Sequence, residues 1–183
     1  MTSEHDPTTS VSNALTLRPW RHGDEEFLVA ALNDPEIVRF TVTIPQPYTL
    51  ELAKQWVREL AGDGWRSGGA EFAIDLGDGL AVGSIAIRRV ARESEVVGTV
   101  GYWVAPRARG RGLAGQALAL LAPWAAEYLD LGQQELIHDL ENIASCKSAL
   151  SGCFEIDGIV RGGSHYRDGS PRDVERHRWV VPR

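Results

Sequence analysis

The stretch Gly98–Leu121, GTVGYWVAPRARGRGLAGQALALL, decides the fold of this chain. Its first part, Thr99–Val104, is rich in β-branched and aromatic residues and predicts a buried strand. Pro106 ends that strand because proline has no backbone N–H to donate to a sheet. Leucines and alanines of high helix propensity then predict a helix from Leu113 to about Leu129.

The loop between these two elements concentrates glycine and arginine. The start of a helix leaves backbone N–H groups unpaired and carries a partial positive charge. Glycines let that backbone approach an anion closely, and arginines add donors suited to phosphate oxygens. The loop therefore predicts an anion-binding cradle for a pyrophosphate, formed by Arg107, Arg109, Gly110, Arg111 and Gly112.

A second interpretation of the same loop is a dinucleotide-binding turn. Gly110-x-Gly112-x-x-Gly115 satisfies the pattern G-x-G-x-x-G. Dinucleotide-binding folds place the first glycine close to the strand end, however, and an acidic residue at the tip of the second strand. Here Pro106 and two arginines come before the first glycine, and the nearby acidic residues lie around a turn. An NAD(P)-dependent oxidoreductase therefore remains an alternative that the residues favour less, as does an incidental surface turn.

The composition is that of an ordinary globular protein. The chain has 183 residues, of which 43% are hydrophobic and 24% charged, enough for one domain with a sizeable core. A formal net charge of −6 argues against a nucleic-acid binder with a basic surface and mildly favours amine-bearing partners. No apolar run is long enough to span a bilayer, and no secretory signal is present. We therefore expect a cytoplasmic protein without nucleic-acid or membrane partners.

The chain divides into a tail and one domain. Residues 1–13 are polar and predict an N-terminal tail, which leaves residues 14–183 as a single domain. The two cysteines, Cys146 and Cys153, are too few for a disulfide framework, and no ligand spacing around them predicts a metal site. We expect buried thiols, with a catalytic thiol at Cys146 as the alternative.

The remaining hydrophobic patterns predict a meander of strands before the cradle and a crossover unit after it. Asp24 and Thr49 are expected to cap helices. The strand Leu136–His138 is expected to run parallel to Thr99–Val104, because a helix connects them. The other expected elements are strands at Leu15–Arg18, Glu71–Leu76, Leu80–Val90, Phe154–Arg161 and Arg176–Val181, helices at Glu25–Asn33, Leu50–Leu60 and Ile143–Leu150, and a loop at Gly162–Asp173.

Several stretches together resemble a known family. Arg107-x-x-Gly110-x-Gly112, preceded by Val104-Ala105-Pro106, resembles the acetyl-coenzyme A signature of the Gcn5-related N-acetyltransferases (GNAT). Leu15–Trp20, Leu32–Ile37 and Asn142–Ser145 resemble motifs of the ribosomal-protein N-terminal acetyltransferase branch of that superfamily. The resemblance implies a GNAT-like α/β fold, with a mixed, mostly antiparallel central sheet of about seven strands and helices on both faces.

The resemblance also implies a function. The chain is expected to transfer an acetyl group from acetyl-CoA to a primary amine by direct attack in a ternary complex. A protein or peptide N-terminus is slightly preferred over a small amine. An α-amino group of pKa about 8 is roughly one tenth neutral at pH 7, whereas a lysine is neutral in under about one part in a thousand. A homodimer is one candidate assembly.

Site residues follow from the same resemblance. An N–H near Val104 or Ala105 is expected to polarise the thioester carbonyl. Tyr48 and Trp56 are expected to line the acceptor groove. The implied cofactor-binding residues are Val104, Arg107, Arg109, Gly110, Arg111, Gly112, Leu113, Ala114, Gly115, Asn142 and Ser145.

The chain departs from its apparent branch at the catalytic positions. The glutamate that often comes just before Gly101-Tyr102 is missing, and so is the tyrosine donor of the helix after Asn142. These losses make a catalytically weakened acyl-CoA-binding module the alternative function. The remaining candidates are Ser145 as a proton donor, His138 as a proton relay, and Glu71, Glu93 and Glu95 for drawing off the proton of the amine through water.

Overall fold

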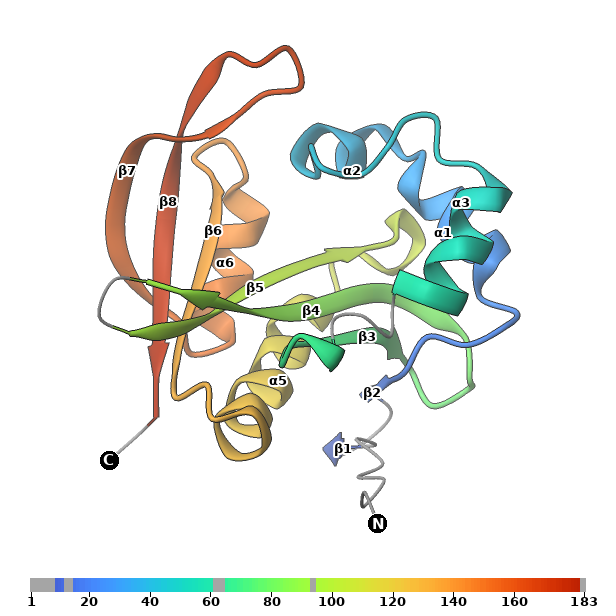
Figure 1. Ribbon diagram of the computed structural model, residues 1–183, viewed down its shortest axis with the longest axis horizontal. Coiled ribbons are helices and arrows are strands. Elements are labelled where there is room, and N and C mark those ends of the chain that lie inside the picture. Colours follow the sequence, from blue (N-terminus) through green and yellow to red (C-terminus); the bar gives the residue numbers. More distant parts are fainter. Residues whose placement is uncertain (1–8, 12–14, 61–64, 93–94, 182–183) are drawn as a thin grey trace.

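The computed structural model of the chain describes residues 9–11, 15–60, 65–92 and 95–181. An eight-stranded sheet runs through it in the order β1-β2-β3-β4-β5-β6-β8-β7 (Figure 1). Among its strand pairs only β5 and β6 are parallel. The strands are β1 (Thr9–Val11), β2 (Leu15–Arg18), β3 (Ala70–Asp75), β4 (Ala81–Ala91), β5 (Val96–Val104), β6 (Gln133–Asp139), β7 (Glu155–His165) and β8 (Pro171–Val180).

This arrangement confirms the mixed, mostly antiparallel sheet and the parallel crossover. The sheet has one strand more than the expected seven, because Thr9–Val11 of the expected tail pairs with β2 at the edge. Residues 1–8 and 12–14, the rest of the tail region, lie outside the described residues, as does Glu93.

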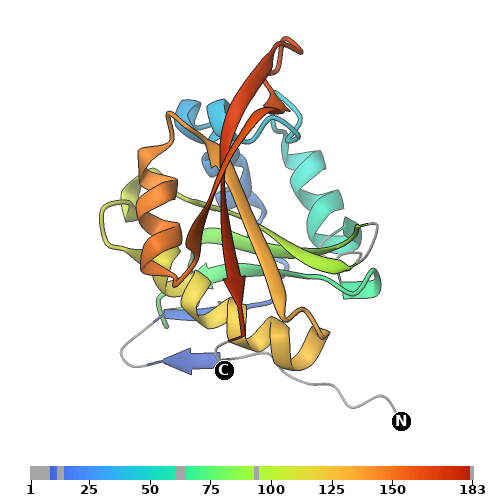
Figure 2. The same ribbon diagram turned by 90° about the vertical axis from the view of Figure 1, so that its left-hand side faces the viewer.

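Helices cover both faces of the sheet. α5 lies on one side of β3–β5 and α1 and α3 lie on the other, as Figures 1 and 2 show. No helix in the described ranges is long and apolar enough to cross a membrane. The helices are α1 (Glu25–Leu32), α2 (Pro35–Phe40), α3 (Leu50–Gln55) with a π-helical continuation (Trp56–Leu60), a short 3-10 helix (Pro106–Ala108), α5 (Leu113–Leu129) and α6 (Ile143–Ser151).

Two hydrophobic cores result from the alternation of side chains along the strands. On β3, Phe72 and Ile74 belong to the core under α5, whereas Ala73 belongs to the core under α1–α3. The first core takes the inner face of α5, including the fully buried Leu118 and Leu121. Both layers therefore follow from the period-two pattern of the strands.

The structure corrects two expectations about element ends. The expected loop Gly162–Asp173 is mostly strand: β7 extends to His165 and β8 begins at Pro171. The register shifts between Val160 and Ser164, so the hairpin bulges around its glycines and then pairs again. The expected helix Leu50–Leu60 is α-helical only to Gln55 and continues as a π-helix.

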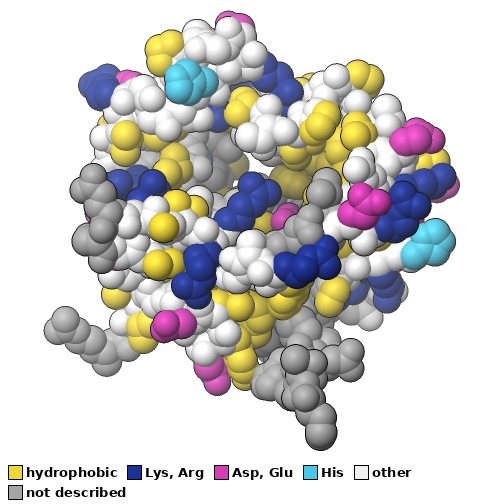
Figure 3. All heavy atoms as spheres, viewed as in Figure 1, with side chains coloured by type: hydrophobic (Ala, Val, Ile, Leu, Met, Phe, Trp, Pro, Cys, Tyr) yellow, Lys and Arg dark blue, Asp and Glu magenta, His cyan; other side chains and the backbone are white. Residues whose placement is uncertain are grey.

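β5 and β6 diverge along part of their length. Their parallel pairing covers only Gly98–Val100 and Gln134–Leu136, whereas β5 pairs with β4 as far as Val104. The second half of β5 therefore presents its other edge to a gap. Figure 3 shows a hollow on this face of the molecule, in which hydrophobic side chains gather.

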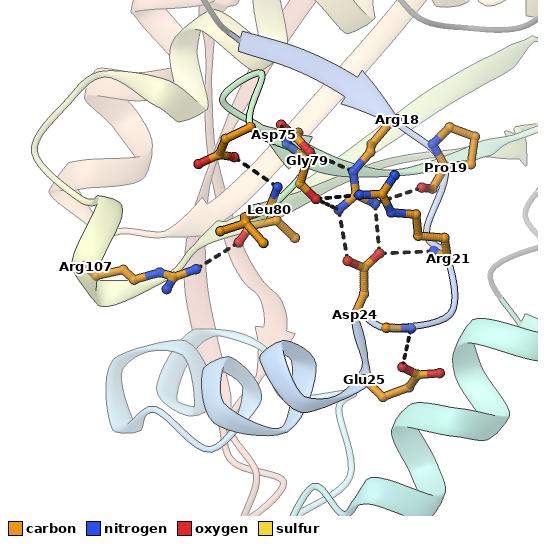
Figure 4. Close-up of polar contacts among 12 residues, drawn as sticks. Arg18, Pro19, Arg21, Asp24, Glu25, Asp75, Gly79, Leu80 and Arg107 are labelled. Carbon is orange, nitrogen blue, oxygen red and sulfur yellow. Dashed lines mark hydrogen bonds and ion pairs between the residues drawn. The ribbon is translucent and has the colours of Figure 1, made fainter.

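Arg18 at the end of β2 fixes the N-terminal part of the fold. Its guanidinium donates to Asp24 at 2.8 and 2.9 Å and to Asp75 Oδ2 at 2.8 Å (Figure 4). This ion pair corrects the expected role of Asp24, whose side chain makes no capping hydrogen bond to α1. Burial works to raise the pKa of Asp75, but Arg18 and the amides of Gly77 and Gly79 keep that pKa below its ordinary value.

Candidate acyl-transfer site

The loop between β5 and α5 has the geometry of an anion site. Gly110 and Gly112 have φ angles of +76° and +69°, in the left-handed region that favours glycine. The first backbone hydrogen bond of α5 runs from the Gln116 N–H to the Gly112 carbonyl at 3.1 Å. The three amides before Gln116 therefore point out of the helix start. A Cβ added at Gly110 would meet no atom within 4 Å, so open space lies beside the loop.

The arginines of the loop differ in what they contact. Arg109 donates through Nε to the Val104 carbonyl at 3.2 Å and pairs with Asp34, which caps α2. Burial works to raise the pKa of Asp34, but the Arg109 guanidinium and the α2 amides lower it below its ordinary value. Arg107 lies elsewhere (Figure 4). It donates to the Ala81 carbonyl at 3.2 Å, and its guanidinium lies over the Phe27 ring. Arg111 is exposed.

A cavity of about 270 Å³ opens beside this loop. It is bounded by α2, the end of β5, the start of α5 and the start of α6. Of the expected cofactor-binding residues its lining includes Val104, Arg109, Gly110, Gly112, Leu113, Ala114, Asn142 and Ser145, but not Arg107, Arg111 or Gly115.

Gly115 serves helix packing. A Cβ at this position would come 2.6 Å from Ser151 Oγ and 3.2 Å from the Ser148 carbonyl. Gly152 is equally tight, because a Cβ there would come 2.4 Å from Leu118 Cβ and 3.2 Å from the Gly115 carbonyl. The two glycines let α5 and the end of α6 approach closely, which explains Gly115 without any ligand.

The backbone at the end of β5 distinguishes between the two expected N–H donors to the thioester carbonyl, those of Val104 and Ala105. The Ala105 N–H donates to the Val82 carbonyl at 2.9 Å and is therefore committed to β4. Because hydrogen-bonding directions alternate along an antiparallel strand, the N–H and C=O of Val104 point to the opposite edge, toward the gap. The hydrogen bond from Arg109 to the Val104 carbonyl agrees with this direction. Of the two expected donors, Val104 is the one that faces the cavity.

Three polar residues lie between the cavity and the gap. The Tyr102 hydroxyl is 2.8 Å from Ser145 Oγ and 3.2 Å from the Ser145 carbonyl. Asn142 caps α6 by accepting the Ser145 N–H at 3.0 Å through Oδ1. Burial raises the pKa of Tyr102 above its ordinary value. Sequence reasoning expected Ser145 and Asn142 here but did not single out Tyr102, which lies far from both in the chain.

A second, larger cavity of about 510 Å³ adjoins the first. The two share Phe40, Thr41, Tyr102, Trp103, Asn142 and Ser145. It extends over β3, β4 and β5 toward Glu71 and Arg88. Tyr48 and Trp56, the expected groove residues, line a neighbouring cavity of about 330 Å³ that also reaches Glu71.

Glu71 is one of the titratable residues that line the larger cavity, together with Arg88 and His138. It stands on β3, and its burial raises its pKa to about 7, an effect that the nearby Arg88 only partly offsets. Burial, together with Glu71, also raises the pKa of Tyr48 to about 12. Glu71 therefore changes its charge near neutral pH, as a proton acceptor for this cavity must. From the sequence it was one of three glutamates with nothing to distinguish them.

His138, the expected proton relay, has both ring nitrogens engaged. Nδ1 lies 2.8 Å from the Asp139 carbonyl, and Nε2 lies 3.0 Å from His177 Nε2 and 3.3 Å from Glu175 Oε2. Cys146 belongs to the same group of side chains. Its thiol has a raised pKa because of burial and of Glu175. This group lies at the junction of β6, β8 and α6, and His138 also lines the larger cavity.

Residues 14–151 match the acetyltransferase (GNAT) domain family. The chain belongs to this family. GNAT proteins are acetyl-CoA-dependent acetyltransferases, so the chain is an acyltransferase with acetyl-CoA as its cofactor. The mostly antiparallel sheet likewise differs from the parallel sheet of dinucleotide-binding folds. The open space beside Gly110 and the outward amides of α5 fit the diphosphate of coenzyme A.

Solved structures with the same fold include ribosomal-protein acetyltransferases. RimJ of Mycobacterium smegmatis, in complex with a CoA disulfide, shares 21% identity at a TM-score of 0.80, over 92% of this chain and 83% of that chain. The Salmonella typhimurium acetyltransferase that modifies the N-terminal serine of 50S ribosomal protein L7/L12 shares 19% identity at 0.79, over 94% and 98%.

A third solved structure contains a nucleotide as well as acetyl-CoA. The microcin C7 self-immunity acetyltransferase MccE, in complex with acetyl-CoA and AMP, shares 15% identity at a TM-score of 0.78, over 96% of this chain and 97% of that chain. At such identities the three structures show a common fold. No curated protein matches the sequence significantly.

Proposed function

We propose that this GNAT enzyme acetylates the N-terminal α-amino group of a protein or peptide by direct attack in a ternary complex. The observation that carries the proposal is the meeting of two cavities around Tyr102 and Ser145, at the gap between β5 and β6. Donor and amine can then approach from opposite sides of β5, with no covalent enzyme intermediate between them.

The residues on the donor side, at the loop before α5 and the end of β5, bind and orient acetyl-CoA. The outward amides of α5 and the Arg109 guanidinium hold the diphosphate, and Val104 and Asn142 bind the pantetheine arm along the free edge of β5. When bound, acetyl-CoA supplies the acetyl group as an activated thioester. The N–H of Val104, which faces the gap, donates to the thioester oxygen as negative charge develops there.

The acceptor side manages the proton of the amine. A primary amine attacks only when neutral and loses a proton as it forms the amide. With its pKa of about 7, Glu71 is largely a carboxylate slightly above neutrality and accepts that proton, directly or through a water molecule. An α-amino group of pKa about 8 needs little more help than this, which favours it over a lysine side chain.

A proton donor is needed for the coenzyme A sulfur as it leaves. Tyr102 carries its proton at neutral pH as any tyrosine does, and burial raises its pKa further. Its hydroxyl is hydrogen-bonded to Ser145. We assign the proton donor to this pair. A thiol pKa of about 8.5 makes such assistance modest.

The similar structures support an N-terminal acceptor and also define the rival. The Salmonella protein modifies a ribosomal-protein N-terminus, whereas MccE binds AMP beside acetyl-CoA. A small amine is therefore the second candidate acceptor. Cytoplasmic location and pairing into a homodimer stay predictions.

The test is a turnover assay with acetyl-CoA and three sets of acceptors: peptides with free N-termini, the same peptides with blocked N-termini and one lysine, and small amines. Release of coenzyme A thiol and mass of the product are measured. We expect turnover with free N-termini and an acetylated α-amine. Turnover with small amines alone would refute the acceptor class. Binding of acetyl-CoA without thiol release on any amine would establish the weakened binding module instead.

A further inference from the structure

Four side chains with metal-ligating atoms converge where β6, β8 and α6 meet. They are His138, Cys146, Glu175 and His177, and their ligand atoms all lie within 4.8 Å of one another. Two imidazoles, a thiol and a carboxylate are the residue types that bind Zn²⁺ in proteins. None of the four is needed for the acyl-transfer steps proposed above.

The spacing of the ligand atoms fits a tetrahedral ion. The Nε2 atoms of His138 and His177 are 3.0 Å apart. Glu175 Oε2 lies 3.1 Å from the His177 atom and 3.3 Å from the His138 atom. With Zn–N and Zn–O bonds of about 2.0–2.1 Å, a tetrahedral ion holds neighbouring nitrogen and oxygen ligands about 3.3 Å apart. Small outward shifts therefore make room for the ion.

The hydrogen bonds around the cluster leave electron pairs directed at its centre. The carbonyl of Asp139 only accepts, so Nδ1 of His138 carries the proton of the neutral ring and Nε2 presents a lone pair. That lone pair faces Glu175 Oε2, a second acceptor, at 3.3 Å. His177 Nε2 lies within hydrogen-bond distance of both atoms, so a proton there can be shared between them, and a cation at the centre can take the place of that proton. The bond to Asp139 is the outer contact that orients a metal-bound imidazole.

The burial of the four side chains is also compatible with a bound ion. His177 is fully buried and His138 is 7% exposed, while the Glu175 side chain is 18% exposed and Cys146 is half-buried. The partial exposure of Cys146 and Glu175 gives an ion a path of entry.

We propose that His138, Cys146, Glu175 and His177 bind one Zn²⁺ ion in a closed tetrahedral site. The thiol releases its proton to solvent, so a thiolate and a carboxylate balance the charge of the ion, and the two imidazoles are neutral. Four protein ligands leave no open position, which makes the ion structural. It joins β6 and β8 to α6, the helix that carries Ser145 at the cavity wall.

The experiment measures zinc in the full-length protein and then in variants. We expect about one zinc per chain after purification without chelators. After stripping, Zn²⁺ should raise the melting temperature, and Co²⁺ should give a thiolate-to-metal charge-transfer band with tetrahedral d–d bands. Cys146→Ser should remove the charge-transfer band and weaken Zn²⁺ binding at least about tenfold. Cys153→Ser, at the other cysteine, should leave both unchanged.

The serine variant separates the two accounts of the cluster, because a hydroxyl can still donate a hydrogen bond to Glu175 but is a poor zinc ligand. A protein that is purified without metal and gains no stability from Zn²⁺ would overturn the proposal. So would equal Zn²⁺ affinity in the two cysteine variants. Neither result depends on catalytic activity.

Discussion

The Tyr102 hydroxyl on β5 lies 2.8 Å from Ser145 Oγ on α6, so a hydrogen bond joins β5 to α6 beside the gap. If this pair protonates the leaving sulfur, Tyr102→Phe should lower kcat about tenfold while the KM for acetyl-CoA changes little. Steady-state kinetics measure both constants. Tyr128→Phe, on α5, is the control and should behave like the wild type. Equal losses in the two variants would rule out the specific role.

Glu71→Gln tests the proton acceptor. Because the pKa of Glu71 is about 7, wild-type kcat/KM should rise through neutral pH in two limbs, one from Glu71 and one from the amine. The variant should lose the lower limb and about a hundredfold in rate above it. Glu51→Gln, on the exposed side of α3, should keep both limbs. A pH profile of unchanged shape in Glu71→Gln would remove Glu71 from the mechanism.

The same pKa has a consequence for stability. The folded-state pKa lies above the ordinary value of 4.5, so the folded state binds the proton more tightly than the unfolded state does. Stability is then lost as the pH rises from about 4.5 through about 7. Glu71→Gln should therefore melt increasingly higher than the wild type between pH 5 and pH 8. A constant difference over that range would contradict the raised pKa.

Gly112→Val tests the cradle. A β-branched residue at a φ of +69° is strained, which shifts the amides that bind the diphosphate. The KM for acetyl-CoA should rise at least about tenfold, with the acceptor KM unchanged. Gly169→Val is a matched control, because Gly169 lies in the β7–β8 turn with a φ of +84°, and a Cβ added there would meet no atom within 4 Å. The Gly169→Val variant should have similar backbone strain but an unchanged KM for acetyl-CoA.

Gly115→Ala should affect folding and not the cofactor. The added Cβ would lie 2.6 Å from Ser151 Oγ and 2.8 Å from Ser151 Cβ, so α5 and α6 must move apart. We expect a loss of about 1–3 kcal/mol in the free energy of unfolding, measured by denaturant titration. The double variant Gly115→Ala/Ser151→Gly should recover most of it. A raised KM for acetyl-CoA at unchanged stability would instead place Gly115 in the cofactor site.

Much of the fold was predictable from local patterns. The α5 helix begins at Leu113 and ends at Leu129 as the leucine and alanine run predicts, and the crossover makes β5 and β6 parallel. The strands at Phe154–Arg161 and Arg176–Val181 were predicted too, but their extension to His165 and back to Pro171 was not. The glycine-rich, charged tip lacks hydrophobic alternation and pairs through backbone groups around a bulge. The length of these two strands is set by their pairing with each other, which the sequence pattern does not show.

The site divides in the same way. The cradle is continuous in sequence, so its glycines and arginines could be recognised together. Glu71, Tyr102 and the cluster around His138 and Cys146 draw on residues far apart in the chain, and only the sheet order brings them together. The desolvation that singles out Glu71 depends on the neighbours it acquires on folding. No spacing in the sequence carries that information.

Because β5 and β6 diverge, one edge of β5 is paired only over its first half. The backbone groups of Val104 that point to this edge have no strand partner. A bound pantetheine arm that pairs there completes the ladder as an extra strand does. Empty enzyme and loaded enzyme should then differ in the slow opening of this region. Amide hydrogen exchange at the end of β5 ought to slow when coenzyme A binds, while the β7–β8 turn exchanges as before.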